Sequence, residues 1–441
     1  MDVVDLTSLT DYESFIINGL HRSELDFRDT QGDSVVPLTL GYPTTKMVDD
    51  VSRIMQIACE TRLAEERQSG NHMFNYGGRM GDPLLRVELV KFLSRHYGYD
   101  VASKDLLITS GASFALYHLG AKFFEAGDIV FAEEPTYFVA IDIIEKDIRM
   151  RVVHVSIDED GIIPDELEKR IQKFYPKDGF VPSKQKLFWA MLFVIPCFQN
   201  PSSRCLSEER CKKVVHLARK YHLLVVSDDL YGPLRWGYSK NDNKLGLAPK
   251  RLRFYDNEGD PDYFGNVVSN CSFSKFMAPG LRVGWIEGPP VVLAKIGTSS
   301  LIESAGGFNQ FTSGLIGKAL ELGLVDEHLK EVCNEYKERV ETIQKILDKN
   351  LQGIIKYKVP QGGFFMWIEL PETMHCSKLE ELCKRKYGVL FHCGHRFTKI
   401  EGHLTNFIRI SFSYCERERL FNGVKNLAAA VLELHLESKK G

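Results

Sequence analysis

Seven short apolar segments, spaced by longer segments with helical periodicity, constrain the fold of this chain most. Between about residues 82 and 290 the sequence contains "DLLITSG", "DIVFAEE", "MRVVHVS", "KLFWAMLFVIP", "HLLVVSDDLY", "VVSNCSFS" and "RVGWIEG". Almost continuous apolar runs are typical of strands that helices cover on both faces, and such strands pair mostly in parallel through right-handed crossovers. The sequence therefore predicts an α/β domain with a mostly parallel seven-stranded sheet flanked by helices.

The last quarter of the chain has a different pattern. Residues 326–351 carry apolar side chains at helical spacing and predict a long amphipathic helix. After it, "GGFFMWIEL" and "FIRISFS" predict half-buried strands, and a helical segment closes the chain. We therefore expect two domains, a large one over residues 41–324 and a smaller α+β domain formed by residues 1–40 and 325–441.

Composition and charge argue against several classes of partner and location. A formal net charge of −3 gives no global attraction to nucleic acid or to an anionic membrane, so we expect a small-molecule partner. The N-terminal "MDVVDLTSLTDYESF" lacks the features of a secretory signal, and the longest apolar run, "FWAMLFVIP", is too short to span a bilayer. Ten scattered cysteines, without Cys-x-x-Cys or zinc-finger spacing, predict reduced thiols in a cytoplasmic protein and no metal site.

The predicted strand ends carry the chemically unusual residues, and the carboxyl ends of parallel strands are where such sheets bind ligands. In "NCSFSKFMAPGLRVGW", Lys275 stands beside Ser272 and Ser274, and Arg282 follows seven residues later. A glycine turn permits close approach of the backbone to a ligand, and the guanidinium of arginine suits a phosphate. Lysine, hydroxyls and arginine together indicate a site for an aldehyde that carries a phosphate.

This segment resembles the lysine segment of class I and II aminotransferases, the fold type I enzymes that use pyridoxal 5′-phosphate. Further motifs occur in the order of that family: "LTLGYPTT", "FNYGGRMGDPLLR", "LITSGASFALYHLG", "FAEEPTYF", "IPCFQNPSS", "VVSDDLYGPL" and "NFIRISFS". The resemblance extends from about residue 36 to 435, and "LRVGW" with "GGFNQ" looks most like the kynurenine and 2-aminoadipate aminotransferase branch. One departure is Ser202-Ser203, where the family usually has Thr-Gly.

The resemblance implies roles for residues around the cofactor. Lys275 would form the Schiff base with pyridoxal phosphate and shuttle the substrate Cα proton. Asp228 would bind the protonated ring nitrogen, with the adjacent Asp229 left open as the alternative, and Tyr231 and Asn200 would bond the phenolic oxygen. The remaining cofactor contacts would come from Tyr137 on the ring, and from Ser272, Ser274, Arg282, Tyr76 and the amides of Ala112 and Ser113 on the phosphate. In this family the tyrosine that corresponds to Tyr76 comes from the neighbouring subunit, so the resemblance implies a homodimer with shared sites.

The resemblance also implies a substrate site. Arg409 would bind the substrate α-carboxylate, with Gly41 and Asn200 beside it. Arg79 is a candidate for a distal carboxylate, whereas aromatic lining from Tyr42 or Phe391 would favour bulky apolar or aromatic amino acids. The loop "FHCGHRF" should border the site, with His392 and His395 as structural polar residues and Cys393 where the family usually has proline.

The sequence thus predicts an enzyme that moves the amino group of an aromatic or 2-aminoadipate-like amino acid to a 2-oxo acid such as 2-oxoglutarate. One alternative keeps the cofactor and makes the protein a β-lyase of cysteine conjugates. Another is a non-catalytic protein that binds pyridoxal phosphate, like the aminotransferase-like domains of certain bacterial transcription regulators. Such regulators need a DNA-binding domain in front, and the motifs here begin by Gly41.

Overall fold

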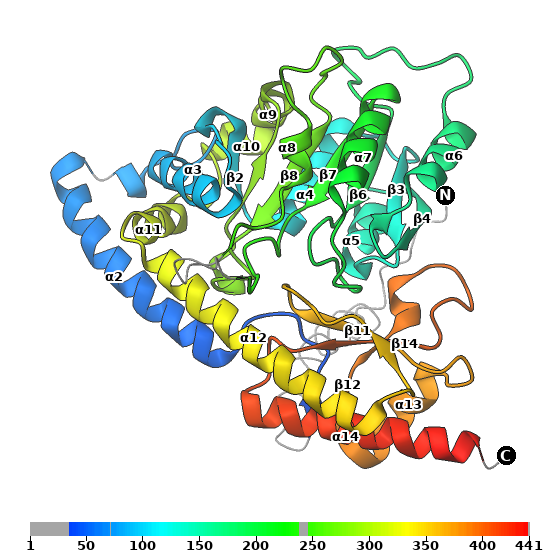
Figure 1. The fold of residues 1–441 in the computed structure, drawn as a ribbon. Helices are drawn as coiled ribbons and strands as arrows, with labels where there is room; N and C mark the ends of the chain where they lie inside the picture. Colours follow the sequence, from blue (N-terminus) through cyan, green and yellow to red (C-terminus); the bar gives the residue numbers. More distant parts are fainter. Residues whose placement is uncertain (1–34, 71, 238–245, 440–441) are drawn as a thin grey trace, which may run out of the picture.

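The computed structural model describes residues 35–70, 72–237 and 246–439, so residues 1–34 of the predicted small domain lie outside the described part. Two lobes are visible in Figure 1, one around a large sheet and one around a small sheet. Helices α2 (Thr45–Ser69) and α12 (Leu324–Leu351) lie side by side along one edge of the molecule, and α12 passes from the large lobe to the small one. The exact domain boundaries stay a prediction.

The large sheet has the predicted α/β architecture. Strands β4, β3, β6, β7 and β8 are parallel neighbours, whereas β9 runs antiparallel between β8 and β2. The order across the sheet is β2 (Leu106–Thr109), β9 (Gly284–Glu287), β8 (Val267–Ser272), β7 (Leu223–Asp228), β6 (Ala190–Val194), β3 (Ile129–Glu134), β4 (Arg151–Asp158) and β5 (Gly161–Ile162). The seven predicted strands are therefore present, and the two-residue β5 adds an antiparallel edge.

Burial on both faces explains why these strands are continuous apolar runs. In β6, Met191 and Phe193 pack into one hydrophobic core while Leu192 and Val194 pack into a second core on the other face. The covering helices of this lobe are α3 (Pro83–Tyr97), α4 (Ala112–Phe123), α5 (Phe138–Asp142), α6 (Pro164–Phe174), α7 (Glu208–Lys220), α8 (Leu252–Tyr255), α9 (Pro290–Gly297), α10 (Ser300–Ala305) and α11 (Gln310–Glu321).

The small lobe is an antiparallel sheet packed against helices. Its order is β10 (Lys356–Tyr357), β11 (Phe365–Glu369), β14 (Phe407–Ser411) and β13 (His392–Cys393). Helices α13 (Cys376–Leu382) and α14 (Arg417–Ser438) belong to this lobe, and α14 packs along α12. A short parallel pair joins β1 (Val36–Pro37) to β12 (Val389–Leu390), which brings the segment before Gly41 to the small lobe.

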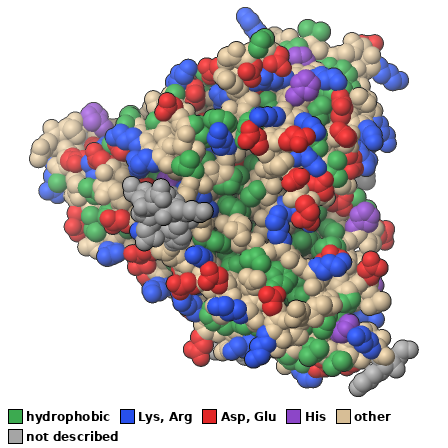
Figure 2. All heavy atoms as spheres, in the orientation of Figure 1, with side chains coloured by type: hydrophobic (Ala, Val, Ile, Leu, Met, Phe, Trp, Pro, Cys, Tyr) green, Lys and Arg blue, Asp and Glu red, His purple; other side chains and the backbone are tan. Residues whose placement is uncertain are grey.

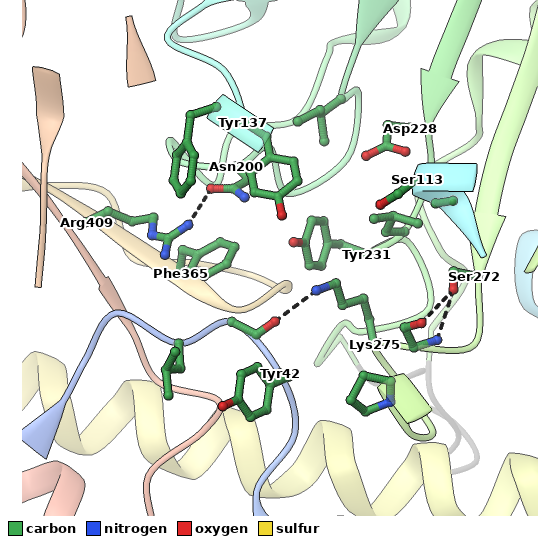
Figure 3. A pocket seen from close by; sticks show the side chains of 18 of the residues that line it. Tyr42, Ser113, Tyr137, Asn200, Asp228, Tyr231, Ser272, Lys275, Phe365 and Arg409 are labelled. Carbon is green, nitrogen blue, oxygen red and sulfur yellow. Dashed lines mark hydrogen bonds between the residues drawn. The ribbon is translucent and has the colours of Figure 1, made fainter. Parts of the chain in front are cut away.

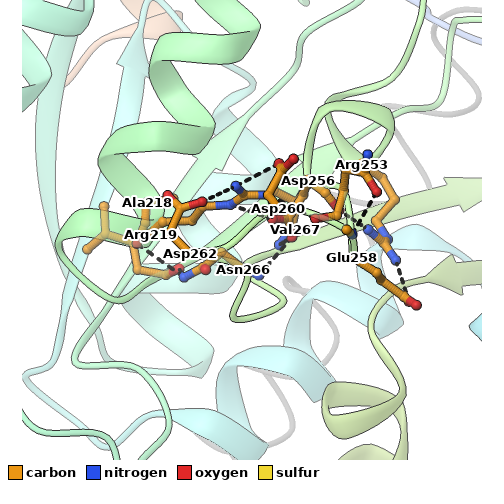
Figure 4. Close-up of polar contacts among 12 residues, drawn as sticks. Ala218, Arg219, Arg253, Asp256, Glu258, Asp260, Asp262, Asn266 and Val267 are labelled. Carbon is orange, nitrogen blue, oxygen red and sulfur yellow. Dashed lines mark hydrogen bonds and ion pairs between the residues drawn. The ribbon is translucent and has the colours of Figure 1, made fainter.

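A buried polar network fixes the start of β8, the strand that leads to Lys275 (Figure 4). Asp256 is fully buried and accepts hydrogen bonds from Arg219 Nε at 3.0 Å and from the backbone amides of Asn266 and Val267 at 2.8 and 3.0 Å. A buried carboxylate is stable only when its oxygens are paired in this way. The network therefore ties the end of α7 to the first residue of β8.

The surface carries both signs of charge. On the face in Figure 2, acidic and basic side chains are interspersed over both lobes, in agreement with the small net charge. Within the described residues, no helix has the length and apolar character needed to cross a membrane.

Candidate active site

A cavity of about 330 Å³ lies at the carboxyl ends of the central strands, between the two lobes (Figure 3). It brings together all but one of the predicted site residues: Gly41, Ala112, Ser113, Tyr137, Asn200, Asp228, Tyr231, Ser272, Ser274, Lys275, Arg282 and Arg409. Tyr76 is the exception, because it does not line this cavity and its side chain is 84% exposed.

Lys275 follows the end of β8 and points into the cavity. Its Nζ donates a hydrogen bond to the Gly41 carbonyl at 2.9 Å. Desolvation lowers the pKa of this amine from 10.5 to about 8; Asp228 opposes the shift, and the positive charges of Arg409 and Arg282 add to it. The site thus favours the neutral, nucleophilic form of the amine.

Asp228 is the last residue of β7 and is only 6% exposed. Its Oδ1 accepts a hydrogen bond from Asn270 Nδ2 at 3.0 Å. Burial, and then the neighbouring Asp229, raise the pKa of Asp228 to about 7, against the opposing effects of Lys275 and Asn270. A buried acid without an ion-pair partner among the described residues is suited to a ligand that brings a positive charge.

Asp229, the alternative to Asp228, points elsewhere. It does not line the cavity, and its Oδ2 accepts a hydrogen bond from Ser227 Oγ at 2.9 Å. Burial raises its pKa to about 6, while the positive charge of Arg251 opposes this shift. The geometry therefore favours Asp228 as the residue that meets a ligand, and Asp229 as part of the protein interior.

Hydroxyl groups, an arginine and a helix terminus form an anion-binding corner of the cavity. Ser272 Oγ donates to Ser274 Oγ at 2.9 Å, and Arg282 Nη1 lies 3.4 Å from Ser274 Oγ. Helix α4 begins at Ala112, so its first amides and the positive end of its dipole lie at the same corner. Glycine is favoured at position 111 before it, because the residue has φ +95°, and a Cβ there would lie 2.7 Å from Arg282 Nη2 and displace the guanidinium.

Arg409 lies on β14 of the small lobe and is 3% exposed. Its Nη1 donates to Asn200 Oδ1 at 2.9 Å and its Nη2 to the Thr39 carbonyl at 2.6 Å, while its guanidinium carbon lies 3.9 Å from the Phe365 ring centroid. The Nε atom is buried and has no hydrogen-bond partner among the described residues. Desolvation lowers the pKa of Arg409 to about 9. This cation forms no ion pair with a described Asp or Glu, so it is suited to an anionic ligand.

The departure from the family at Ser202-Ser203 has a local explanation. Ser202 donates from both its amide and its hydroxyl to Gln199 Oε1, at 2.9 and 2.6 Å, and Ser203 Oγ donates to the Phe365 carbonyl. Ser203 has φ +55°, the left-handed region that favours glycine. Side-chain hydrogen bonds therefore hold the turn that follows Asn200, and they tie it to β11.

Several cavity residues were not predicted. Phe138 and Phe365 form an aromatic wall of the cavity. The other lining residues that were not predicted are Thr39, Leu40, Ile195, Leu230 and Pro279. Of the further candidates, Tyr42 and His392 line it. Phe391 does not and packs in the core, and Arg79 lies outside the cavity, 3.3 Å from Glu303. The one sequence signal for Phe365 is its place in the aromatic strand "GGFFMWIEL", which does not show that its ring lines the cavity.

Comparison with known proteins identifies the family. The model of the family described as aminotransferase class I and II matches residues 46–427. The chain belongs to this family. Aromatic-amino-acid aminotransferase 1 from Thermococcus litoralis is 29% identical to it over 96% of this chain and 95% of that protein. The mitochondrial kynurenine/alpha-aminoadipate aminotransferase of Bos taurus is 27% identical over 91% of this chain and 92% of that protein.

A solved structure agrees with this assignment. A kynurenine aminotransferase from Pyrococcus horikoshii in complex with PMP superimposes with a TM-score of 0.77 at 27% identity, covering 94% of each chain. The predicted family, fold type I architecture, cofactor and enzyme class are therefore confirmed: the protein is a pyridoxal-phosphate-dependent aminotransferase.

The side chains of the cavity fit pyridoxal phosphate. The amine of Lys275 suits the aldehyde, the unpaired acid Asp228 suits a protonated ring nitrogen, and the anion-binding corner suits the phosphate. When bound, the cofactor supplies an aldehyde for the amino group and a ring that accepts the electron pair left when Cα loses its proton.

Proposed function

We propose that this aminotransferase moves the amino group of an aromatic or 2-aminoadipate-like amino acid to a 2-oxo acid such as 2-oxoglutarate. The observation that carries the proposal is Arg409, a buried cation with a free Nε, no acidic partner among the described residues, and a place in the same cavity as Lys275. A guanidinium in this state suits a carboxylate. Both amino acids and 2-oxo acids carry one beside the reacting carbon.

The walls around Arg409 favour aromatic donors within this class. Phe138, Phe365 and Tyr42 line the cavity, and the cationic side chains in its lining are Lys275, Arg282 and Arg409. Arg282 belongs to the anion-binding corner, so the described residues of the lining offer no further arginine or lysine to a distal carboxylate. His392 also lines the cavity, but burial and the nearby Arg409 lower its pKa to about 2, so it is neutral.

The residues of the chain divide the catalytic tasks. Arg409 binds the α-carboxylate and so orients Cα toward Lys275, whose neutral amine removes the proton from Cα and returns it later. Asp228, held by Asn270, keeps a positive charge at the ring nitrogen. That charge is what makes removal of the Cα proton possible.

Asn200 and Tyr231 act on the phenolic oxygen of the cofactor. Asn200 uses its Oδ1 to accept from Arg409, so its Nδ2 is the group that can donate. Tyr231 is buried and packs edge-on against Phe364, and burial raises its pKa well above 10, so its hydroxyl keeps its proton and can donate as well. Asn200 thereby links the substrate carboxylate site to the cofactor site.

The active form that we propose is a homodimer in which Tyr76 reaches the phosphate of the partner's site. Its exposure supports this proposal, since a tyrosine with 84% exposure in one chain is accessible to a second copy. Three other large apolar side chains are also exposed and could be covered in such a dimer: Phe74, Phe311 and Leu301. The rings of Phe74 and Phe311 pack against each other with centroids 5.7 Å apart.

A location in the cytoplasm stays a prediction. All ten cysteines are free thiols.

A donor panel tests the reaction. Aromatic amino acids, kynurenine and 2-aminoadipate are incubated with the holoenzyme and either 2-oxoglutarate or pyruvate, and the products are separated. We expect the donor's 2-oxo acid together with glutamate or alanine. Release of ammonia and pyruvate from cysteine conjugates, without amino transfer, would make the protein a β-lyase instead.

A mixing experiment tests the shared site. We expect Lys275→Ala and Tyr76→Ala chains each to be weakly active or inactive, whereas a mixed dimer has one site with both residues intact. We expect activity to appear when the two variants are denatured together and refolded. If the mixture stays as inactive as its parents while sedimentation shows dimers, Tyr76 does not act across the interface.

A further inference from the structure

A cluster of metal-ligand side chains lies in the small lobe, separate from the residues that line the cavity. It consists of Cys376 at the start of α13, Cys393 at the end of β13, and His395 in the short helix η6 (Gly394–Phe397). Their Sγ and ring nitrogen atoms all lie within 4.8 Å of one another. We propose that these three side chains bind a structural Zn²⁺ ion. Glu380 lies beside Cys393 but outside this group of mutually close ligand atoms, and it becomes the fourth ligand by a side-chain movement toward the ion.

Two separations match those of atoms that share one tetrahedral zinc, and the ligand atoms of Cys376, Cys393 and His395 all lie within 4.8 Å of one another. Zn–S bonds of about 2.3 Å and Zn–N or Zn–O bonds of about 2.0–2.1 Å place two ligands roughly 3.5–3.8 Å apart. Cys376 Sγ lies 3.6 Å from His395 Nδ1, and Cys393 Sγ lies 3.8 Å from Glu380 Oε2. Glu380 and Cys376 are four residues apart on α13, so they lie on one face of the helix. The other oxygen of Glu380 pairs with Lys384 at 3.0 Å, which leaves Oε2 toward the cluster.

The chemistry of the ligands favours zinc over other ions. Two thiols and an imidazole are soft or borderline ligands that Mg²⁺ and Ca²⁺ do not choose. Cys376 and Cys393 are buried, whereas His395 is exposed and gives the ion a path from solvent. A disulfide between the two cysteines would use neither His395 nor Glu380. Sequence spacing does not indicate this site, since its ligands come from two segments without zinc-finger spacing.

The site would brace one wall of the catalytic cavity. Cys393 follows His392, which lines the cavity, and in the pairing of β13 with β14 His392 lies opposite Arg409. Phe397, at the end of the same short helix, lies under the Arg409 guanidinium at 5.1 Å. Zinc held by Cys393 and His395 on one side and by α13 on the other would fix this segment. We therefore expect metal loss to raise KM for the amino donor more than it lowers kcat.

Zinc content and affinity of the holoenzyme test the proposal. The protein is depleted with a chelator, titrated with ZnCl₂ against a chromophoric competitor, and assayed for metal by mass spectrometry. We expect about one zinc per chain, as in other structural sites with four protein ligands. His395→Ala should weaken binding by about 100-fold or more, since even second-shell changes cost 10–100-fold. His395→Cys should retain most of the affinity.

The choice of variants separates a lost ligand from a lost fold. His395 is exposed, so its replacement leaves the core intact, and a thermal melt with zinc absent should match wild type. Cys59→Ser, on α2, removes a thiol outside the cluster and should leave zinc binding unchanged. Equal zinc affinity in wild type and His395→Ala, no zinc uptake by wild type, or a Cys376–Cys393 disulfide in the purified metal-free protein would each overturn the proposal.

Discussion

Replacing Asp228 by asparagine removes one charge at the base of the cavity and little else. The asparagine keeps the size of the side chain and an oxygen that can accept from Asn270 Nδ2, the hydrogen bond seen at 3.0 Å. Asp229 offers a matched control, because it is the adjacent residue and is also buried, but it does not line the cavity. The pair therefore separates the loss of a charge at the ligand from the loss of a charge in the interior.

The expected magnitude follows from the burial of Asp228. Removing one partner of a buried charge pair costs about 3–5 kcal/mol. Each 1.36 kcal/mol added to the barrier lowers a rate about tenfold, so kcat of Asp228→Asn should fall by roughly 10²- to 10⁴-fold. Asp229→Asn loses its charge interaction with Arg251, which still pairs with Glu287 at 2.5 Å. It should change kcat little, because Asp229 does not line the cavity.

The assay compares kcat, bound cofactor and unfolding in both variants. Asp228→Asn should retain the cofactor, measured by visible absorption, because the anion-binding corner is unchanged. Its apoenzyme should also be more stable than wild type at pH 8: burial raises the pKa of Asp228 from 3.8 to about 7, so the wild type loses stability between about pH 4 and pH 7, and the loss is complete at pH 8. Full activity in Asp228→Asn with an inactive Asp229→Asn would refute the assignment.

Four other outcomes follow from the same structure. Lys275→Ala should abolish both turnover and the visible absorption of the cofactor, whereas a fully coloured and active variant would exclude this lysine. Recombination of the apoenzyme with pyridoxal phosphate should speed up about tenfold per pH unit until about pH 8 and then level off, because only the neutral Lys275 amine attacks and its pKa is about 8; a flat profile from pH 6 to 9 would contradict this. Arg409→Lys loses the planar fork and should lower kcat/KM by roughly 30-fold or more, the 2 kcal/mol or more expected for a buried charged pair, chiefly through KM; an unchanged KM would contradict it. Asp256→Ala should lower the unfolding free energy by about 3 kcal/mol in urea with kcat of the folded enzyme unchanged, since it breaks a buried network away from the cavity.

The strand ends could be predicted from sequence because their residues break a local rule. Asp228 ends a buried strand that is mostly apolar, and Lys275 comes three residues after β8, a strand that is fully buried although half of its side chains are polar. Parallel strands of one sheet bring such residues to one edge, which is why residues from 112 to 282 meet in one cavity. The order of the motifs along the chain then indicated the family. No single motif could do so, because each one alone also fits an ordinary turn or helix cap.

The parts that could not be predicted depend on contacts between distant segments. Phe365 and Phe391 are both apolar residues of the small lobe, and only the three-dimensional register places the first in the cavity and the second in the core. Likewise, Cys376 and Cys393 are seventeen positions apart by number, and only the packing of α13 beside β13 brings their sulfur atoms together. Sequence spacing carries no signal for either.

The two arginines and the acid around Lys275 explain how one amine can serve the whole reaction. Asp228 raises the pKa of Lys275, whereas Arg409 and Arg282 lower it. Desolvation also lowers this pKa, and its effect is larger than that of any one of the three charges. Binding changes this balance, because a phosphate neutralises Arg282, a substrate carboxylate neutralises Arg409, and a protonated ring nitrogen neutralises Asp228. Each ligand therefore removes one of the charges that act on the amine, and burial alone keeps it neutral in the filled site. Proton transfer at Cα then depends on the walls that exclude water from the amine. The aromatic side chains of Phe138 and Phe365 form part of these walls and so help to keep the pKa of Lys275 low.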